Sequence, residues 1–268
     1  MPPDAEARAA PPPPVGRLIR GQRAIVALSL AGLAALAWLW LAGMPAVGDS
    51  GHSAMAMGQA PADVWSAAYL LPAFAMWTLM MVAMMLPSAA PMILLYGRMA
   101  SRPGVPHPLA YTAAFTAAYL GIWTLFSAAA ALAQAASVST GLVSDMALAI
   151  GDARTAGALL VLAGLYQLSP IKQACLDQCR SPLSFIIRLS RPGASGALRI
   201  GLAHGLYCLG CCWALMLLLF VGGVMNLAWI AALTLIVLAE KLAPASFLFS
   251  RFLALLLIAG GAILFATG

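Results

Sequence analysis

Long apolar stretches recur along most of the chain and are separated by short polar or basic segments. Seven such stretches occupy residues 24–42, 68–95, 109–133, 156–168, 200–221, 226–239 and 245–267. A helix needs about 20 apolar residues to cross the hydrocarbon core of a bilayer. Because lipid offers no partner for backbone groups, spanning segments are helices or closed barrels. The pattern predicts an all-α, polytopic transmembrane helical bundle of about seven spans.

The segments between these stretches divide the chain into four parts. Residues 1–23 are rich in Ala and Pro, a composition typical of a disordered tail. Stretch 24–42 follows a basic flank and exceeds the roughly 7–15 residues of a signal-peptide core, so we interpret it as an uncleaved signal-anchor helix. Cleavage after it would leave six spans. Residues 43–67 form a predicted exported loop, and residues 68–268 form the helical membrane domain.

Composition and charge agree with a membrane protein. The chain is 63% hydrophobic and 8% charged, whereas a soluble domain has about 25% charged residues. We interpret the net charge of +6 as a topology signal rather than a sign of nucleic-acid binding. A cytoplasmic N-terminus and seven spans would leave Arg154 as the one basic residue outside, among 14 Lys and Arg. Glu240, next to Lys241, would then lie at the cytoplasmic interface; the alternative is a role in proton coupling.

A histidine and three cysteines in stretch 200–221 are the strongest chemical signal. His204, Cys208, Cys211 and Cys212 are spaced by steps of three and four, which on a helix place their side chains within an arc of roughly 100°. Thiolate and imidazole suit Cu(I) and Zn(II), and a thiolate-rich site favours the softer ion. The alternative is that these cysteines are small buried residues that only fill space.

Two further cysteines lie in the connection 169–198, which the predicted topology places in the cytoplasm. Cys175 and Cys179 are four residues apart, so a short helix would present both on one face. Five cysteines is an odd number, and the predicted exported loops contain none. The sequence therefore predicts no disulfide framework.

Methionine is concentrated in stretch 68–95, which contains six of the 14 in the chain. The four that we assign to a soft-metal path are Met80, Met81, Met84 and Met85. The alternative is a flexible packing face, because Met fills irregular gaps well. Pro87 and Pro91 are expected to bend or break this helix.

The exported loop carries its own group of soft ligands. His52, Met55 and Met57 lie within six residues, and imidazole and thioether groups can capture copper. The alternative is a polar linker with incidental Met. Together with the other groups, these residues would form a series that begins with Met outside, continues with Met and Cys at mid-membrane, and ends with Cys inside.

Three strings carry a resemblance to a known family. They are MMVAMMLPS at 80–88, YQLSPIKQACLDQCRSP at 166–182 and HGLYCLGCCWALM at 204–216. In this order they resemble the bacterial family catalogued as domain of unknown function 2182, a predicted metal-binding integral membrane protein, over residues 68–266. The resemblance implies a multi-pass protein of the bacterial inner membrane. It also implies a metal role for Met80, Met81, Met84, Met85, Cys175, Cys179, Cys208, Cys211 and Cys212.

The favoured hypothesis is a membrane protein that binds a soft metal, Cu(I) before Zn(II), for transport or delivery. An exported metal donor or acceptor protein would be its partner. The chain lacks the phosphate-binding loop of an ATP-driven pump, and we assign no catalytic residue. One alternative is a membrane thiol–disulfide oxidoreductase that pairs Cys208 with Cys211 or Cys212 and Cys175 with Cys179. The other is a structural or assembly protein without metal.

Overall fold

The computed structural model describes residues 15–43, 63–102, 104–144, 148–191, 193–243 and 246–268. Within these ranges the chain forms ten α-helices and no β-strand, which confirms the predicted all-α class. The helices are α1 (Val15–Gly43), α2 (Ala67–Ala100), α3 (Pro108–Ser139), α4 (Ala153–Gln167), α5 (Pro170–Arg180), α6 (Pro182–Leu189), α7 (Gly193–Leu217), α8 (Leu219–Gly222), α9 (Leu227–Leu242) and α10 (Ser246–Thr267).

Each predicted apolar stretch coincides with one or two consecutive helices, but fewer than seven can cross a bilayer unaided. Among the described residues, five segments have the length and hydropathy of a span: Ala24–Gly43, Ala67–Ala100, Pro108–Ser139, Gly193–Gly222 and Phe247–Thr267. α4 and α5 add a sixth if this pair, bent by 62° at its break, is one span. α9 has 16 residues and is therefore about 24 Å long, against an apolar core of about 30 Å. The supported count is five or six.

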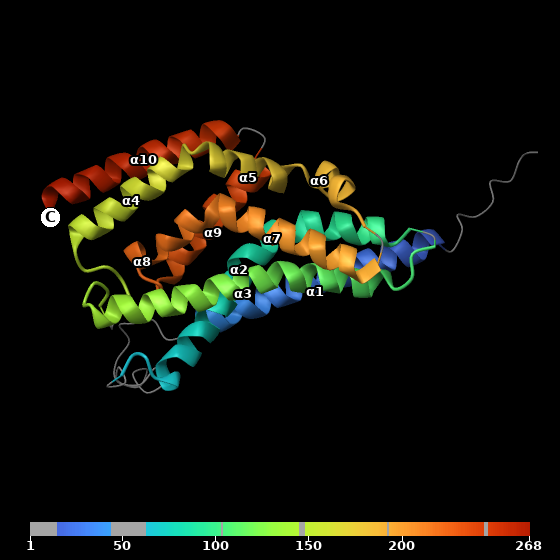
Figure 1. The fold of residues 1–268 in the computed structure, drawn as a ribbon, viewed down its shortest axis with the longest axis horizontal. Coiled ribbons are helices and arrows are strands. Elements are labelled where there is room, and N and C mark those ends of the chain that lie inside the picture. The colour runs from blue at the N-terminus through green and yellow to red at the C-terminus, as the bar shows by residue number, and fades with distance from the viewer. Residues whose placement is uncertain (1–14, 44–62, 103, 145–147, 192, 244–245) are drawn as a thin grey trace, which may run out of the picture.

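The helices pack around a centre formed by α2, α3, α7 and α9 (Figure 1). α1 lies along α2, and α3 packs between α2 and α7. α4 and α10 run beside each other at the opposite edge of the bundle. Leucines on the outer helices, such as Leu28 of α1 and Leu255 of α10, are exposed, as expected for faces that contact lipid.

Polar caps mark the starts of the shorter helices. Asp152 caps α4, where its carboxylate accepts hydrogen bonds from the Thr155 hydroxyl at 2.6 Å and the Thr155 N–H at 2.8 Å. These hydrogen bonds from Thr155 lower the pKa of Asp152. Asn226 caps α9 through the Trp229 N–H at 3.2 Å. Each cap satisfies an N–H that has no partner within its helix.

α2 contains Pro72, Pro87 and Pro91 and yet continues unbroken from Ala67 to Ala100. The helix is therefore not broken at Pro87 or Pro91, where the sequence predicted a bend or a break. Proline has no N–H, so Pro87 leaves the carbonyl of Ala83 without its helical donor. The indole Nε1 of Trp38 on α1 donates to that carbonyl at 3.0 Å. A contact between two helices thus replaces the missing bond within α2.

Segment 169–198 is mostly helical rather than a loop. α4 ends at Gln167, and Ser169 caps α5 by accepting a hydrogen bond from the Ile171 N–H at 3.2 Å. Pro170 follows at the first position of α5, where proline begins a helix easily but cannot continue one. α5 contains both Cys175 and Cys179, which confirms the short helix predicted for them. α5 then packs against α7.

The close approach of α4 and α10 gives a first testable prediction. A Cβ on Gly157 would lie 2.6 Å from the carbonyl oxygen of Gly261. Gly157→Ala should destabilise the protein by about 1–3 kcal/mol, because the two backbones must separate. Thermal unfolding in detergent, followed by tryptophan fluorescence, measures this. Gly260→Ala is the control, since nothing lies within 4 Å of its Cβ position. Equal losses in both variants would contradict the packing.

Candidate metal centre

The predicted thiol-bearing face of α7 points into the bundle. The exposed fractions are 0% for Cys208, 2% for Cys211 and 1% for Cys212. The thiols of Cys211 and Cys212 donate hydrogen bonds to the carbonyl of Cys208, at 3.1 Å and 2.9 Å. These are bonds within one turn of the helix. The thiols of Cys211 and Cys212 therefore both lie against the carbonyl of Cys208, in the carboxyl-terminal half of α7.

One methionine of the predicted set reaches this group from another helix. The thiol of Cys212 lies 3.9 Å from the thioether sulfur of Met85 on α2, and Met85 is fully buried. Met80, Met81 and Met84 are equally buried and pack within the apolar core. Met85 is thus the methionine that the structure places against the thiols.

A ring of hydrogen bonds surrounds Cys208 and joins four helices. The ammonium Nζ of Lys241 (α9) donates to the sulfur of Cys208 and to the hydroxyl of Ser88 (α2), both at 2.9 Å. Ser88 in turn donates to the carbonyl of Met85 at 2.9 Å. The hydroxyl of Tyr119 (α3) donates to the same carbonyl at 3.1 Å and lies 3.2 Å from the Cys208 sulfur. The ring therefore brings a fixed cation to the thiol cluster.

α5 adds its two cysteines to the same side of α7. The thiol of Cys211 interacts electrostatically with those of Cys179 and Cys208. Cys175 packs over Gly210, where a Cβ would lie 2.7 Å from the Cys175 sulfur. The hydroxyl of Tyr166 donates to the carbonyl of Gly210. Cys175 and Cys179 are partly exposed, so the sulfur group extends from a fully buried part to a partly accessible one.

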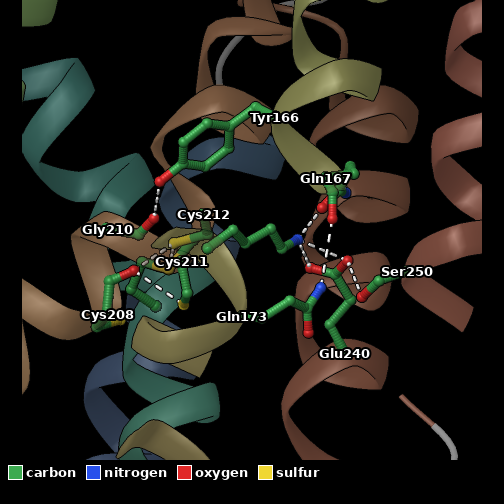
Figure 2. A network of polar contacts seen from close by, with 11 residues as sticks. Tyr166, Gln167, Gln173, Cys208, Gly210, Cys211, Cys212, Glu240 and Ser250 are labelled. Atoms are coloured by element: carbon green, nitrogen blue, oxygen red, sulfur yellow. Dashed lines mark hydrogen bonds and ion pairs between the residues drawn. The ribbon is translucent and has the colours of Figure 1, made fainter. Parts of the chain in front are cut away.

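A buried ion pair lies beside the thiols. The ammonium of Lys172 (α5) contacts both carboxylate oxygens of Glu240 (α9), at 2.7 Å and 2.6 Å, and the side-chain oxygen of Gln167 (α4). The Ser250 hydroxyl of α10 donates to Glu240 at 2.9 Å. Figure 2 shows Glu240, Gln167 and Ser250 on one side and the α7 thiols on the other.

These contacts correct the interpretation of Glu240 and Lys241 as an interfacial pair. Glu240 is 1% exposed and Lys241 is 8% exposed. Because successive residues of a helix differ by about 100° around its axis, the two side chains leave α9 in different directions. Glu240 meets Lys172, and Lys241 meets Cys208.

His204 is buried but lies among aromatic rings. Its imidazole stacks on Tyr119 with ring centroids 5.3 Å apart, and it also contacts Phe115 and Phe185. In the described part of the chain, its Nδ1 atom has no hydrogen-bond partner. Tyr119 stands next to both His204 and Cys208, so the imidazole is one aromatic ring away from the thiols.

The thiol and thioether groups are donors that suit a soft cation, but their side chains are not arranged around a metal ion in this structure. Within the described ranges, no three His, Cys, Asp or Glu side chains are arranged so that they could hold a metal ion. Cys211 and Cys212 are turned toward the carbonyl of Cys208, and metal ligation requires thiolates. Rotation of these side chains away from the carbonyl, together with loss of their protons, would free their sulfur atoms to bind a metal ion beside the Met85 thioether.

Sequence reasoning did not identify the polar groups that surround the thiols and the neighbouring ion pair: Ser88, Tyr119, Gln167, Lys172 and Lys241. Lys172 and Lys241 did carry a signal, since an ionisable residue beside an apolar stretch usually has a buried partner or a function. His52, Met55 and Met57 of the predicted exported ligand group lie outside the described residues.

The burial of the thiols predicts two classes of reactivity in the metal-free protein. Cys175 and Cys179 should react with N-ethylmaleimide first, because Cys208, Cys211 and Cys212 are 0–2% exposed. A local opening that costs about 1.4 kcal/mol would slow the buried thiols about tenfold. Peptide mass spectrometry over a labelling time course in detergent measures the order. A single common rate for all five cysteines would contradict it.

No curated protein and no solved structure matches the chain. A family model named PpoB2 and described as copper chaperone matches residues 74–264. The name differs from domain of unknown function 2182, which the three strings resemble, but both descriptions concern metal. The match covers about seven tenths of the chain and includes every helix from α3 to α9. The chain therefore belongs to the PpoB2 family of copper chaperones.

Proposed function

We propose that the protein is a membrane-embedded copper chaperone that holds Cu(I) as cargo between Met85, Cys208 and Cys212 and passes it on. The observation that carries this proposal is the 3.9 Å contact between the Cys212 thiol and the Met85 thioether, which come from two helices. Packing could be achieved by Leu or Val at these positions. Thiolate and thioether together are the donors that select Cu(I) among biological metals.

Charge balance also favours Cu(I) over Zn(II). A buried charge is costly unless it is paired, and the ammonium of Lys241 already lies 2.9 Å from the Cys208 sulfur. One Cu(I), one ammonium and two thiolates sum to zero. Zn(II) in the same place would leave one unbalanced positive charge inside the bundle.

Cys211 and Cys179 connect the buried ligands of the proposed site to the protein surface. Cys211 interacts with both Cys208 and Cys179, and Cys179 belongs to the partly exposed helix α5. Copper held by two sulfur atoms can move by accepting a third and releasing the first. Such stepwise exchange lets a chaperone bind its cargo tightly and still release it.

We place the protein in a bacterial inner membrane with its N-terminus in the cytoplasm. The apolar helices support a membrane location, and the excess of basic residues in segments predicted to be cytoplasmic supports the orientation. In this topology α4–α5 is a broken span and the short α9 reaches into the bundle. An exported donor or acceptor protein would meet His52, Met55 and Met57 on the outer side.

Copper binding is tested by titration of the protein, purified in detergent under reducing and anaerobic conditions, with Cu(I) against bicinchoninate. We expect one tightly bound Cu(I) per chain. Cys208→Ser and Met85→Leu should each weaken binding by more than about tenfold, because even the loss of a supporting group around a metal costs 10–100-fold in affinity. The same titration with Zn(II) should show weaker binding.

Met76→Leu is the matched control for Met85→Leu. Met76 is also buried in α2 and lies about 13.5 Å from Met85 along the helix axis. Its replacement should leave Cu(I) affinity unchanged. Absence of Cu(I) binding by the wild-type protein, or equal losses in Met76→Leu and Met85→Leu, would overturn the proposed site.

A further inference from the structure

Polar contacts near both ends of α5, the helix that carries the partly exposed thiols, fasten it to the bundle. Lys172 near its start pairs with Glu240 of α9. Near its end, the guanidinium of Arg180 donates to the carbonyl of Ala243 at 2.6 Å. Before α5 the chain bends by 62° at a break next to Ser169 and Pro170. α5 is therefore attached through a bend and fixed in place through its side chains.

The Lys172–Glu240 pair is buried and is supported by further hydrogen bonds, which indicates a specific role. Both side chains are buried, at 0% and 2% exposure, and the nitrogen–oxygen distance is 2.6 Å. Ser250 and Gln167 supply further hydrogen bonds from α10 and α4. A buried ion pair adds little stability in comparison with an apolar pair of the same shape, and its best-attested role is to fix the register of packed elements.

The ion pair fixes the position of α5 along its axis relative to the sulfur cluster. Lys172 precedes Cys175 by three residues, or about 4.5 Å along the helix. Glu240 is the neighbour of Lys241, which contacts Cys208. One ion pair therefore sets the position of the α5 thiols relative to the α7 thiols. Neither charged group contacts the sulfur atoms proposed to hold copper.

We propose that Lys172 and Glu240 are positioning residues that hold α5 closed over the buried cluster, and that α5 is the port through which Cu(I) is exchanged on the cytoplasmic side of the cluster. This inference rests on the copper function proposed above. Cys179 is the exchange ligand, because it is partly exposed and lies one helical turn after Cys175, which packs over Gly210 of α7. When the ion pair opens, α5 swings at the Ser169–Pro170 break and admits a donor or acceptor thiol.

The transfer step is a ligand exchange without electron transfer. On entry, the bond between copper and the Cys211 sulfur forms as the bond between copper and the Cys179 sulfur breaks. The proton that leaves the Cys211 thiol ends on the released Cys179 sulfur. Copper stays Cu(I) throughout, and release follows the same step in reverse. No oxidant or reductant is consumed.

The test uses the double variant Lys172→Met, Glu240→Gln, which removes both charges and keeps the side-chain volumes similar. In the metal-free protein, Cys211 should react with N-ethylmaleimide about tenfold faster, because the local opening becomes easier. Rates of Cu(I) uptake from bicinchoninate and of release to excess bicinchoninate should both rise about tenfold, with Kd unchanged, because an open port speeds both directions equally.

Two further variants distinguish a positioning role of the ion pair from a general loss of stability. Thr234→Val alters a buried residue of α9 whose hydroxyl bonds only within its own helix, to the carbonyl of Ile230 at 2.7 Å, and it should change neither rate. The exchanged pair Lys172→Glu, Glu240→Lys should return both rates and the Cys211 labelling toward the wild-type values. Unchanged labelling in the double variant would overturn the proposal. A weaker Kd with a lower unfolding temperature and unchanged rates would also overturn it.

The two proposals fail in different ways. If the wild-type protein binds no Cu(I), the proposed function is wrong. The labelling of Cys211 in the metal-free protein still reports whether the ion pair holds α5 closed. If Cu(I) binds but the double variant behaves as wild type in labelling and in both rates, the positioning role is wrong and the copper function stands.

Discussion

The ammonium of Lys241, buried between helices, is the constraint on which the centre of this protein depends. A cation removed from water needs acceptors, and the cost of leaving it without them is large. Here the acceptors are the Cys208 sulfur of α7 and the Ser88 hydroxyl of α2. Tyr119 of α3 closes the ring through the carbonyl of Met85. The hydrogen bonds that begin at this one charge thus join four helices. The thiol cluster lies where these helices meet.

α9 connects this ring to a second polar centre. Lys241 lies in the last turn of the helix, where a cation is favoured by the helix dipole. Glu240 lies in the same turn, where a carboxylate is disfavoured, and Lys172 offsets that cost. Neighbouring residues of one turn of α9 thus contact α5 through the ion pair and α7 through Cys208.

The distribution of sulfur suits a carrier. Met85 and Cys208 are fully buried, whereas Cys175 and Cys179 are partly exposed. A site with sulfur at only one depth would either exchange its cargo too readily or not at all. In the proposed mechanism, linked thiols at graded depths would let Cu(I) keep a sulfur ligand at each step. Membership of a copper chaperone family is in keeping with this arrangement.

Local periodicity in the sequence determined the class of fold and one face of the site. Apolar runs predict helices because lipid-facing backbone must bond within its own segment. The steps of three and four predict the α7 arc because helix geometry is the same wherever the helix lies. Cys208, Cys211 and Cys212 do share a buried face. The four-residue spacing of Cys175 and Cys179 predicted α5 in the same way.

Only the tertiary structure decided which helices meet and which polar groups face each other. Lys172 and Glu240 are 68 residues apart, and Cys208 and Lys241 are 33 apart. No local sequence pattern shows that residues so far apart in the chain are in contact. The choice of Met85 among four neighbouring methionines depends on how α2 is rotated against α7 and α9. The 62° bend between α4 and α5 was likewise not predicted from the sequence. Sequence periodicity specifies the faces of single helices, whereas packing between helices specifies which faces touch.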